Sequence, residues 1–200
     1  FNIYYLHVDA NSEYQNIQDL EGKKVAISRV GSGSQLMAYV NAQNQGWDPS
    51  SLEFEIVGDI NGAIEALKEG RADYFMWEHF TTKPLVDNNT FRRVADCPTP
   101  WPCFVIAVKN KVLKFDYADV RRMTDIVNKK SSEILNIPGI DKVFAERYEQ
   151  KIEDIRKWME ITSWSQHQIS EEDLEEVQQQ LLKLDLISNT IDSSCILYNL

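Results

Sequence analysis

The chain has 200 residues, of which 43% are hydrophobic, and its formal net charge at pH 7 is −10. This length and composition allow a sizeable core in one or two domains. The acidic balance argues against nucleic-acid binding, and the apolar runs are far shorter than the roughly 20 residues of a membrane-spanning helix.

The chain begins with "FNIYYLHV", which has no Met and already has the pattern of a strand. We interpret this as an internal start, so the sequence leaves the compartment open. A precursor without a signal peptide would be cytoplasmic, and one with a signal would be periplasmic or lipid-anchored.

Strand and helix patterns alternate along the first half of the chain. Strands are expected at 2–8, 24–28, 53–57, 72–77, 91–95 and 103–108, and helices at 17–22, 34–45 and 61–70. Strands separated by helices of about ten residues indicate βαβ crossovers and a mostly parallel sheet. We therefore expect an α/β unit from about residue 8 to 104.

The second half has almost only helical patterns. Helices are expected at 116–135, 141–148, 151–161 and 170–184. Each has an apolar face to bury, but this half of the chain supplies no sheet. These helices must therefore pack on each other or on structure outside the first unit.

The stretch "KKVAISRVGSGSQLMAYV" joins an expected strand to an expected helix through Gly31–Ser34. A helix begins with unpaired N–H groups and a positive dipole end, which favour an anionic or polar ligand. The turn lacks the lysine of a nucleotide P-loop and the third glycine of a dinucleotide fingerprint. It is either a structural turn or a ligand cradle formed by Ser32, Gly33 and Ser34.

Two further groups are candidates because ligands of open α/β sheets bind beyond the carboxyl ends of the strands. In "MWEHF", Trp77 can stack on a flat ligand and Glu78 can accept its hydrogen bonds. The alternative without a binding role is that Trp77 belongs to the core and Glu78 is solvated. Asn61, in the turn "GDING", is expected at the same edge.

The segment "CPTPWPCF" surrounds Trp101 with three prolines, which stiffen the chain. Trp101 either lines a cleft or covers the surface. Cys97 and Cys103 could pair across this segment; the alternative is that all three cysteines are reduced thiols.

Nothing in the sequence indicates catalysis, a metal or a cofactor. The three histidines are scattered, no Cys/His/Asp cluster has ligand spacing, and no nucleophile elbow is present. We therefore predict a protein that is not an enzyme, with no catalytic residues, no metal ligands and no cofactor.

Three stretches in this order resemble the type 2 periplasmic binding proteins. They are "LEGKKVAISRVGSGSQLMAYVNAQNQGW", "GAIEALKEGRADYFMWEHF" and "PTPWPCFVIAV". The similarity extends over about residues 3–187. It points to the branch of nitrate, sulfonate and taurine binders and thiamine-pyrimidine synthase-like proteins.

The resemblance implies two α/β lobes joined by two crossing strands, with a ligand cleft between them. It assigns residues 1–7 to a hinge crossing and a remnant of lobe 1, residues 8–104 to lobe 2, and residues 105–200 to the return crossing and the helical part of lobe 1. One lobe is then a complete mixed-sheet α/β lobe. The other lobe is incomplete, because the family's segment before the first crossing has no counterpart here, and the tail 188–200 also departs from the family.

The resemblance also implies non-catalytic capture of a small polar or anionic, sometimes aromatic, ligand by hinge closure. The expected partners are that ligand and an ABC-type permease. The binding residues implied are Ser32, Gly33, Ser34, Asn61, Trp77, Glu78 and Trp101. Two alternatives stay open: a thiamine-pyrimidine synthase-like enzyme, and a sensor or interaction protein that kept the fold.

Overall fold

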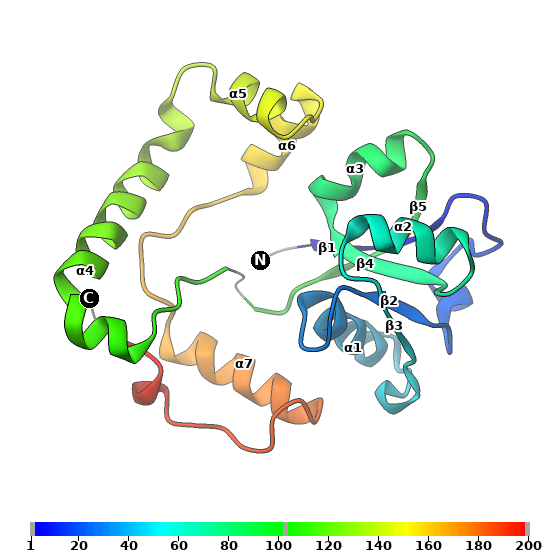
Figure 1. Cartoon of the computed structure of the whole chain (residues 1–200), viewed down its shortest axis with the longest axis horizontal. Coiled ribbons are helices and arrows are strands. Elements are labelled where there is room, and N and C mark those ends of the chain that lie inside the picture. Colours follow the sequence, from blue (N-terminus) through cyan, green and yellow to red (C-terminus); the bar gives the residue numbers. More distant parts are fainter. Residues whose placement is uncertain (1–2, 102–103, 199–200) are drawn as a thin grey trace. The chain divides into compact units, whose positions relative to one another are not determined.

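The computed structural model describes residues 3–101 and 104–198. The chain forms two compact units (Figure 1). Unit 1 comprises residues 1–103 and 184–186, and unit 2 comprises residues 104–183 and 187–200. The predicted fold class, a complete α/β lobe with a mixed sheet accompanied by further helices, is confirmed.

Unit 1 is built on a five-stranded sheet with the strand order β3-β2-β4-β1-β5. Strand β2 is parallel to β3 and β4, whereas β1 is antiparallel to β4 and β5. The strands are β1 (Ile3–Asp9), β2 (Val25–Ile27), β3 (Phe54–Ile56), β4 (Tyr74–Glu78) and β5 (Phe91–Pro98). The carboxyl ends of β2 to β5 therefore share one edge of the sheet with the amino end of β1.

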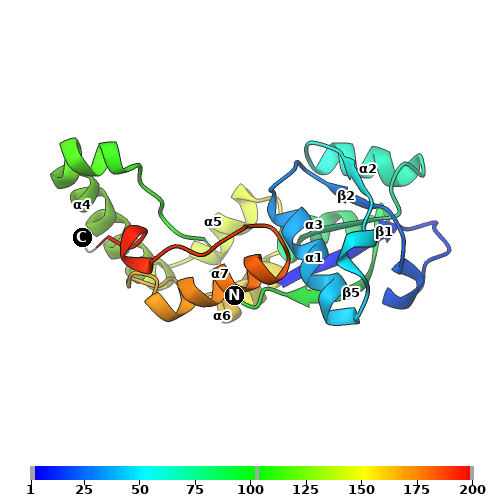
Figure 2. The same cartoon turned by 90° about the horizontal axis from the view of Figure 1, so that it is seen from below.

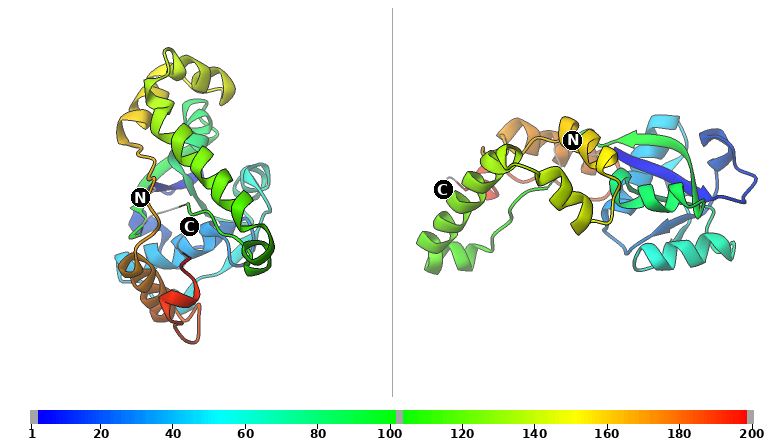
Figure 3. Two further views of the ribbon diagram at one scale, coloured as in Figure 1. Left: turned by 90° about the vertical axis from the view of Figure 1, so that its left-hand side faces the viewer. Right: turned by 90° about the horizontal axis from the view of Figure 1, so that it is seen from above.

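Helices cover both faces of this sheet, as Figures 2 and 3 show for α1 and α2. They are α1 (Gly33–Gln45), α2 (Ile60–Lys68) and α3 (His79–Asp87). The Cys97 thiol lies 3.9 Å from the side chain of Asn44 in α1, whereas Phe75 packs under α2. Because side chains alternate along a strand, the pairing of β1 with β4 and β5 places Cys97 and Phe75 on opposite faces of the sheet. Helix α1 ends at Gly46, whose φ of 74° is the left-handed conformation that glycine adopts readily.

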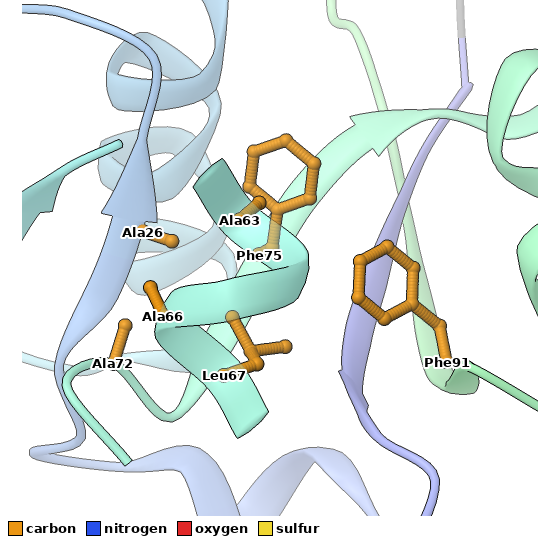
Figure 4. Packing of buried hydrophobic residues seen from close by; sticks show 7 residues of the cluster. All are labelled: Ala26, Ala63, Ala66, Leu67, Ala72, Phe75 and Phe91. Atoms are coloured by element: carbon orange, nitrogen blue, oxygen red, sulfur yellow. The ribbon is translucent and has the colours of Figure 1, made fainter. Parts of the chain in front are cut away.

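The main core lies between α2 and the sheet (Figure 4). Small side chains let the helix approach closely, and two phenylalanines fill the remaining space. The cluster consists of Ala26, Ala63, Ala66, Leu67, Ala72, Phe75 and Phe91. This packing fixes where α2 begins at the carboxyl edge.

Unit 2 is helical in the part that the structure describes. Its α-helices are α4 (Asn110–Glu133), α5 (Ile140–Arg147), α6 (Ile152–Ile161) and α7 (Glu171–Lys183). Helices α5 and α6 meet through the rings of Phe144 and Trp158, whose centroids are 5.6 Å apart, and through an ion pair between Asp141 and Arg156 at 2.8 Å. None of the described helices combines the length and the apolarity that a membrane span requires.

Two predictions about local structure are wrong. Helix α3 was not expected, because Pro84 and two threonines obscure its periodicity. The buried strand predicted at 103–108 is absent from 104–108, where Phe104 is 88% exposed; residue 103 lies outside the described residues. Among the described residues, no strand lies beside this segment to pair with it.

Candidate functional site

Three helices begin at the carboxyl edge of the unit 1 sheet. Each begins at a side chain that accepts hydrogen bonds from the helix's own first N–H groups: Ser32 for α1, Asp59 for α2 and Glu78 for α3. The strands β2, β3 and β4 end just before or at these residues. Three positive dipole ends therefore gather at one edge, which is a favourable environment for negative charge or for hydrogen-bond acceptors.

The two serine hydroxyls at the start of α1 hold the loop together. Ser32 Oγ and Ser34 Oγ lie 2.9 Å apart, and both residues are buried. Ser34 Oγ accepts a hydrogen bond from the Ser28 N–H at 3.1 Å, and Ser32 Oγ accepts a longer one from Gln35 N–H at 3.4 Å. The side chains that were predicted to contact a ligand thus have a structural task.

The backbone of the same loop keeps free donors. Among the described residues, the N–H groups of Gly33 and Ser34 have no hydrogen-bond acceptor, as is usual in the first turn of a helix. Gly33 is also a point of close approach, because a Cβ atom there would lie 2.6 Å from the Tyr4 hydroxyl oxygen. Tyr4, which sequence analysis did not select, therefore belongs to this edge.

Glu78 lies opposite Tyr4 in the β1–β4 pairing. Its carboxylate accepts hydrogen bonds from the N–H groups of Phe80 at 2.9 Å and Thr81 at 3.1 Å, one on each oxygen. The predicted ligand acceptor is therefore the N-cap of α3. Each oxygen retains acceptor capacity, because a carboxylate oxygen accepts more than one hydrogen bond.

Trp77 points to the other face of the sheet. Its ring stacks on Phe75 with centroids 5.1 Å apart and an interplanar angle of 21°, and it packs against the core cluster under α2. The side chain is half-buried. Strand alternation thus separates Trp77 from Glu78, although both lie at the same end of β4.

The remaining two predicted residues lie apart from the serine loop. Asn61 is exposed in the first turn of α2, and its N–H bonds to Asp59 at 2.9 Å. Trp101 is buried beyond the end of β5, where its carbonyl accepts a hydrogen bond from the Thr99 hydroxyl at 3.1 Å. The structure therefore brings Ser32, Gly33 and Ser34 together and distributes the other four residues around the edge.

A cluster around Tyr5, on the sheet face that α2 and α3 cover, was also missed by sequence analysis. The Arg93 guanidinium carbon lies 3.6 Å from the centroid of the Tyr5 ring. The centroid of the His79 ring lies 4.1 Å from that of Tyr5, and the two rings are tilted by 57°. Burial lowers the pKa of His79, and the nearby Glu78 charge opposes that shift. The alternation of side chains along β1 could have shown which sheet face Tyr5 lies on, but nothing in the sequence pairs Tyr5 with Arg93.

Metal chemistry has no support in the described ranges. No group of three or more His, Cys, Asp or Glu side chains there could hold a metal ion. The chemistry available at the edge is hydrogen bonding from backbone N–H groups, together with the field of the helix ends.

Residues 7–97, which lie within unit 1, match the family model described as Ca3427-like PBP. A search among curated proteins finds no significant match.

Solved structures share the fold over almost the whole chain. The Candida albicans CA3427 gene product, described as exhibiting the generic periplasmic binding protein fold, is 18% identical, with a TM-score of 0.84 over 96% of this chain and 65% of its own. The alkanesulfonate-binding protein SsuA from Xanthomonas axonopodis pv. citri, bound to MOPS, is 12% identical, with a TM-score of 0.74 over 96% of this chain and 68% of its own.

A third solved structure is the ligand-binding component of an ABC-type import system from Staphylococcus aureus, with zinc bound. It is 11% identical, with a TM-score of 0.68 over 94% of this chain and 65% of its own. The chain thus spans about two thirds of the length of these proteins. Residues 7–97 are therefore similar to the Ca3427-like PBP family, and the chain has the periplasmic binding protein fold.

Proposed function

We propose that this protein binds a small anionic ligand, without catalysis, at the carboxyl edge of the unit 1 sheet. The observation that carries the proposal is the pair of Gly33 and Ser34 N–H groups, which have no acceptor among the described residues, at the start of α1. These donors point to an oxyanion such as a sulfonate or carboxylate, because the helix dipole and the N–H groups act together there.

Two of the solved relatives support this class of ligand and role. One is an alkanesulfonate-binding protein bound to MOPS, itself a sulfonate, and another is the ligand-binding component of an ABC-type import system. We extend the proposal to an ABC-type permease as the partner that receives the ligand. Of the other predicted residues, Glu78 would then face the polar part of the ligand, because it pairs with Tyr4 beside Gly33.

The test is amide-resolved NMR of the 200-residue protein titrated with methanesulfonate, with tetramethylammonium as the cation of opposite charge. We expect the Gly33 and Ser34 amide resonances to shift with methanesulfonate alone, and the ligand to be recovered unchanged. Shifts confined to other residues, or equal shifts with both ions, would contradict the site. Steady conversion of the ligand would contradict the non-catalytic role.

A matched pair of variants isolates the N–H donor. In a Tyr4→Phe background, which makes room for a Cβ, Gly33→Pro removes the N–H whereas Gly33→Ala keeps it. Proline is tolerated at the first position of a helix, so α1 should form in both variants. We expect methanesulfonate binding to weaken about tenfold in the proline variant relative to the alanine variant, the order of one charge-assisted hydrogen bond.

A further inference from the structure

The chain after α7 returns along that helix and is fastened to it by one buried side chain (Figures 1 and 2, red). Gln178 of α7 is 7% exposed, and its side-chain amide makes two hydrogen bonds to the backbone of Ile191. Its Nε2 donates to the Ile191 carbonyl at 3.0 Å, and its Oε1 accepts from the Ile191 N–H at 2.8 Å. This amide therefore fixes residues 190–194 against the helix.

A cavity of about 500 Å³ lies between α7 and residues 190–194, all of which belong to unit 2. Its wall includes the carboxylates of Glu171, Glu175 and Asp192, and no basic residue is among the described residues that line it. In the part of the chain that the structure describes, no ion pair joins any of these carboxylates to a basic side chain. The cavity therefore has a negative potential, which favours a cation.

Two of the three carboxylates have little compensation within the chain. Glu171 lies in the first turn of α7, where the helix dipole stabilises it, but Glu175 lies one turn further on. Asp192 Oδ1 accepts hydrogen bonds from the hydroxyl and the N–H of Ser194, the latter at 2.9 Å. These bonds lower the pKa of Asp192 because they stabilise its charged form. Asp192 is therefore ionised, and its Oδ2 remains available as an acceptor.

The Ser193 hydroxyl is an independent sign of a ligand. Ser193 is part of the cavity wall and is 6% exposed. Its Oγ is buried and has no hydrogen-bond partner among the described residues. Such groups are uncommon in native proteins, because a buried hydroxyl without a partner has lost its hydrogen bonds to water. Since a serine hydroxyl turns about a single bond, this oxygen can accept a hydrogen bond from a donor in the cavity.

The spacing of the acidic groups selects the class of cation. No three His, Cys, Asp or Glu side chains of the described residues form a group that could hold a metal ion. Carboxylates spread around one cavity suit instead an organic cation whose charges are several bonds apart. We propose that the cavity binds an aliphatic diamine, whose ammonium groups donate to the carboxylates of Glu175 and Asp192 and to the hydroxyl of Ser193. This site lies within unit 2 and does not depend on the proposed anion site of unit 1.

The test is isothermal titration calorimetry of the 200-residue protein with putrescine, a four-carbon diamine, at low ionic strength. We expect saturable binding at a single site, about tenfold tighter than that of butylamine, because butylamine has only one ammonium group for the two carboxylates. Magnesium chloride is titrated in parallel. Absence of saturable binding, equal affinities for putrescine and butylamine, or tighter binding of magnesium would each overturn the proposal.

Matched variants separate the site from general attraction to an acidic surface. Glu175→Gln removes one charge from the cavity wall, and Glu176→Gln removes one from an exposed neighbour outside it. We expect putrescine binding to weaken about tenfold in the first variant and less than about twofold in the second. Equal weakening in both variants would overturn the site.

Ser193→Ala tests the hydroxyl separately. Because Ser193 Oγ has no partner to lose among the described residues, we expect an unchanged urea midpoint by circular dichroism. Putrescine binding should weaken about threefold, the order of one neutral hydrogen bond. A lowered midpoint, or unchanged binding in a folded variant, would contradict the assignment of this hydroxyl to the ligand.

Discussion

Asp73 accepts a hydrogen bond from the Tyr14 hydroxyl at 2.6 Å, across 59 residues of sequence. Its other carboxylate oxygen accepts from the Lys24 N–H at 2.8 Å, just before β2. Asp73 closes the phrase "ALKEGRAD", one of the features on which the family resemblance depended. The acid in this phrase therefore ties an N-terminal loop to the start of a central strand, and its role is structural.

This geometry predicts a large loss of stability on removal of the carboxylate. Asp73→Ala leaves a part-buried hydroxyl and a backbone N–H without their acceptor, so we expect the free energy of unfolding to fall by about 2–3 kcal/mol. Tyr14→Phe removes one of the two bonds and should cost about 1 kcal/mol. Urea unfolding monitored by circular dichroism measures both. Equal stability of the Asp73→Ala variant and the parent would refute the assignment.

The serine pair should behave as one unit. Ser34→Ala leaves the Ser28 N–H without an acceptor, and Ser32→Ala removes the N-cap of α1; each should cost about 1–2 kcal/mol. Because the two hydroxyls share a hydrogen bond, we expect the double variant to lose less than the sum of the single variants. A double-mutant cycle by thermal or urea unfolding measures this coupling, and strict additivity would argue that the 2.9 Å contact is not formed in solution.

Buried His7 predicts an acid-sensitive fold. Burial lowers the pKa of His7 to about 4, and the backbone of Phe75 and Tyr5 opposes this shift only in part. Between the ordinary histidine pKa of 6.5 and about 4, the unfolded chain binds a proton that the folded chain does not. Stability is therefore fully present above pH 6.5 and declines as the pH falls towards 4, by about 3 kcal/mol in total.

The measurement is urea unfolding at several pH values between 7.5 and 4. The variant His7→Phe, which keeps an aromatic ring beside Phe75 and Phe91, should lose most of this pH dependence. The matched control is His167→Gln, because His167 is exposed and its replacement should leave the profile unchanged. A His7→Phe profile that runs parallel to the parent would contradict the prediction.

The two described cysteines should differ in reactivity. Burial raises the pKa of the Cys97 thiol to about 12, and a weak hydrogen bond from Asn44 offsets this slightly. Cys195 is an exposed free thiol. Because the thiolate is the reactive form, iodoacetamide at pH 8 should alkylate Cys195 in the folded protein and Cys97 only after addition of urea. Peptide mass spectrometry reads out each site; rapid labelling of Cys97 in the folded protein would be inconsistent with its burial.

The pattern of apolar residues predicted unit 1 well because local and tertiary preferences agree there. Its strands β1 to β4 and its helices α1 and α2 begin and end within two residues of the expected positions, whereas β5 ends three residues later than expected. Helix α3 escaped prediction because its first turn is fixed by the Glu78 cap and by packing on Tyr5, neither of which periodicity reports. The segment 104–108 has the composition of a strand, but a strand also needs a neighbour, and the sequence of one segment does not supply it.

The candidate site was predictable only at the level of the sheet edge. The carboxyl ends of the expected strands β2, β3 and β4 share one edge of a parallel region, so Ser32, Asn61 and Glu78 could be assigned to one end of unit 1. The direction of each side chain could not be predicted. It depends on the register of β4 and on which side chain accepts hydrogen bonds from the first N–H groups of each helix. Tyr4 was missed for the same reason: its proximity to Gly33 follows from the antiparallel pairing of β1, which no local pattern encodes.

The capping of all three helices at this edge also limits how ligand preference can diverge. A substitution at Ser32, Asp59 or Glu78 alters recognition and helix initiation together. Spacer residues escape this coupling: Arg29 and Val30 are exposed between β2 and the α1 cap, so they can be exchanged without disturbing either element. No such spacer follows β4, where Glu78 ends the strand and begins the helix, so that corner of the edge should accept the fewest changes over evolution.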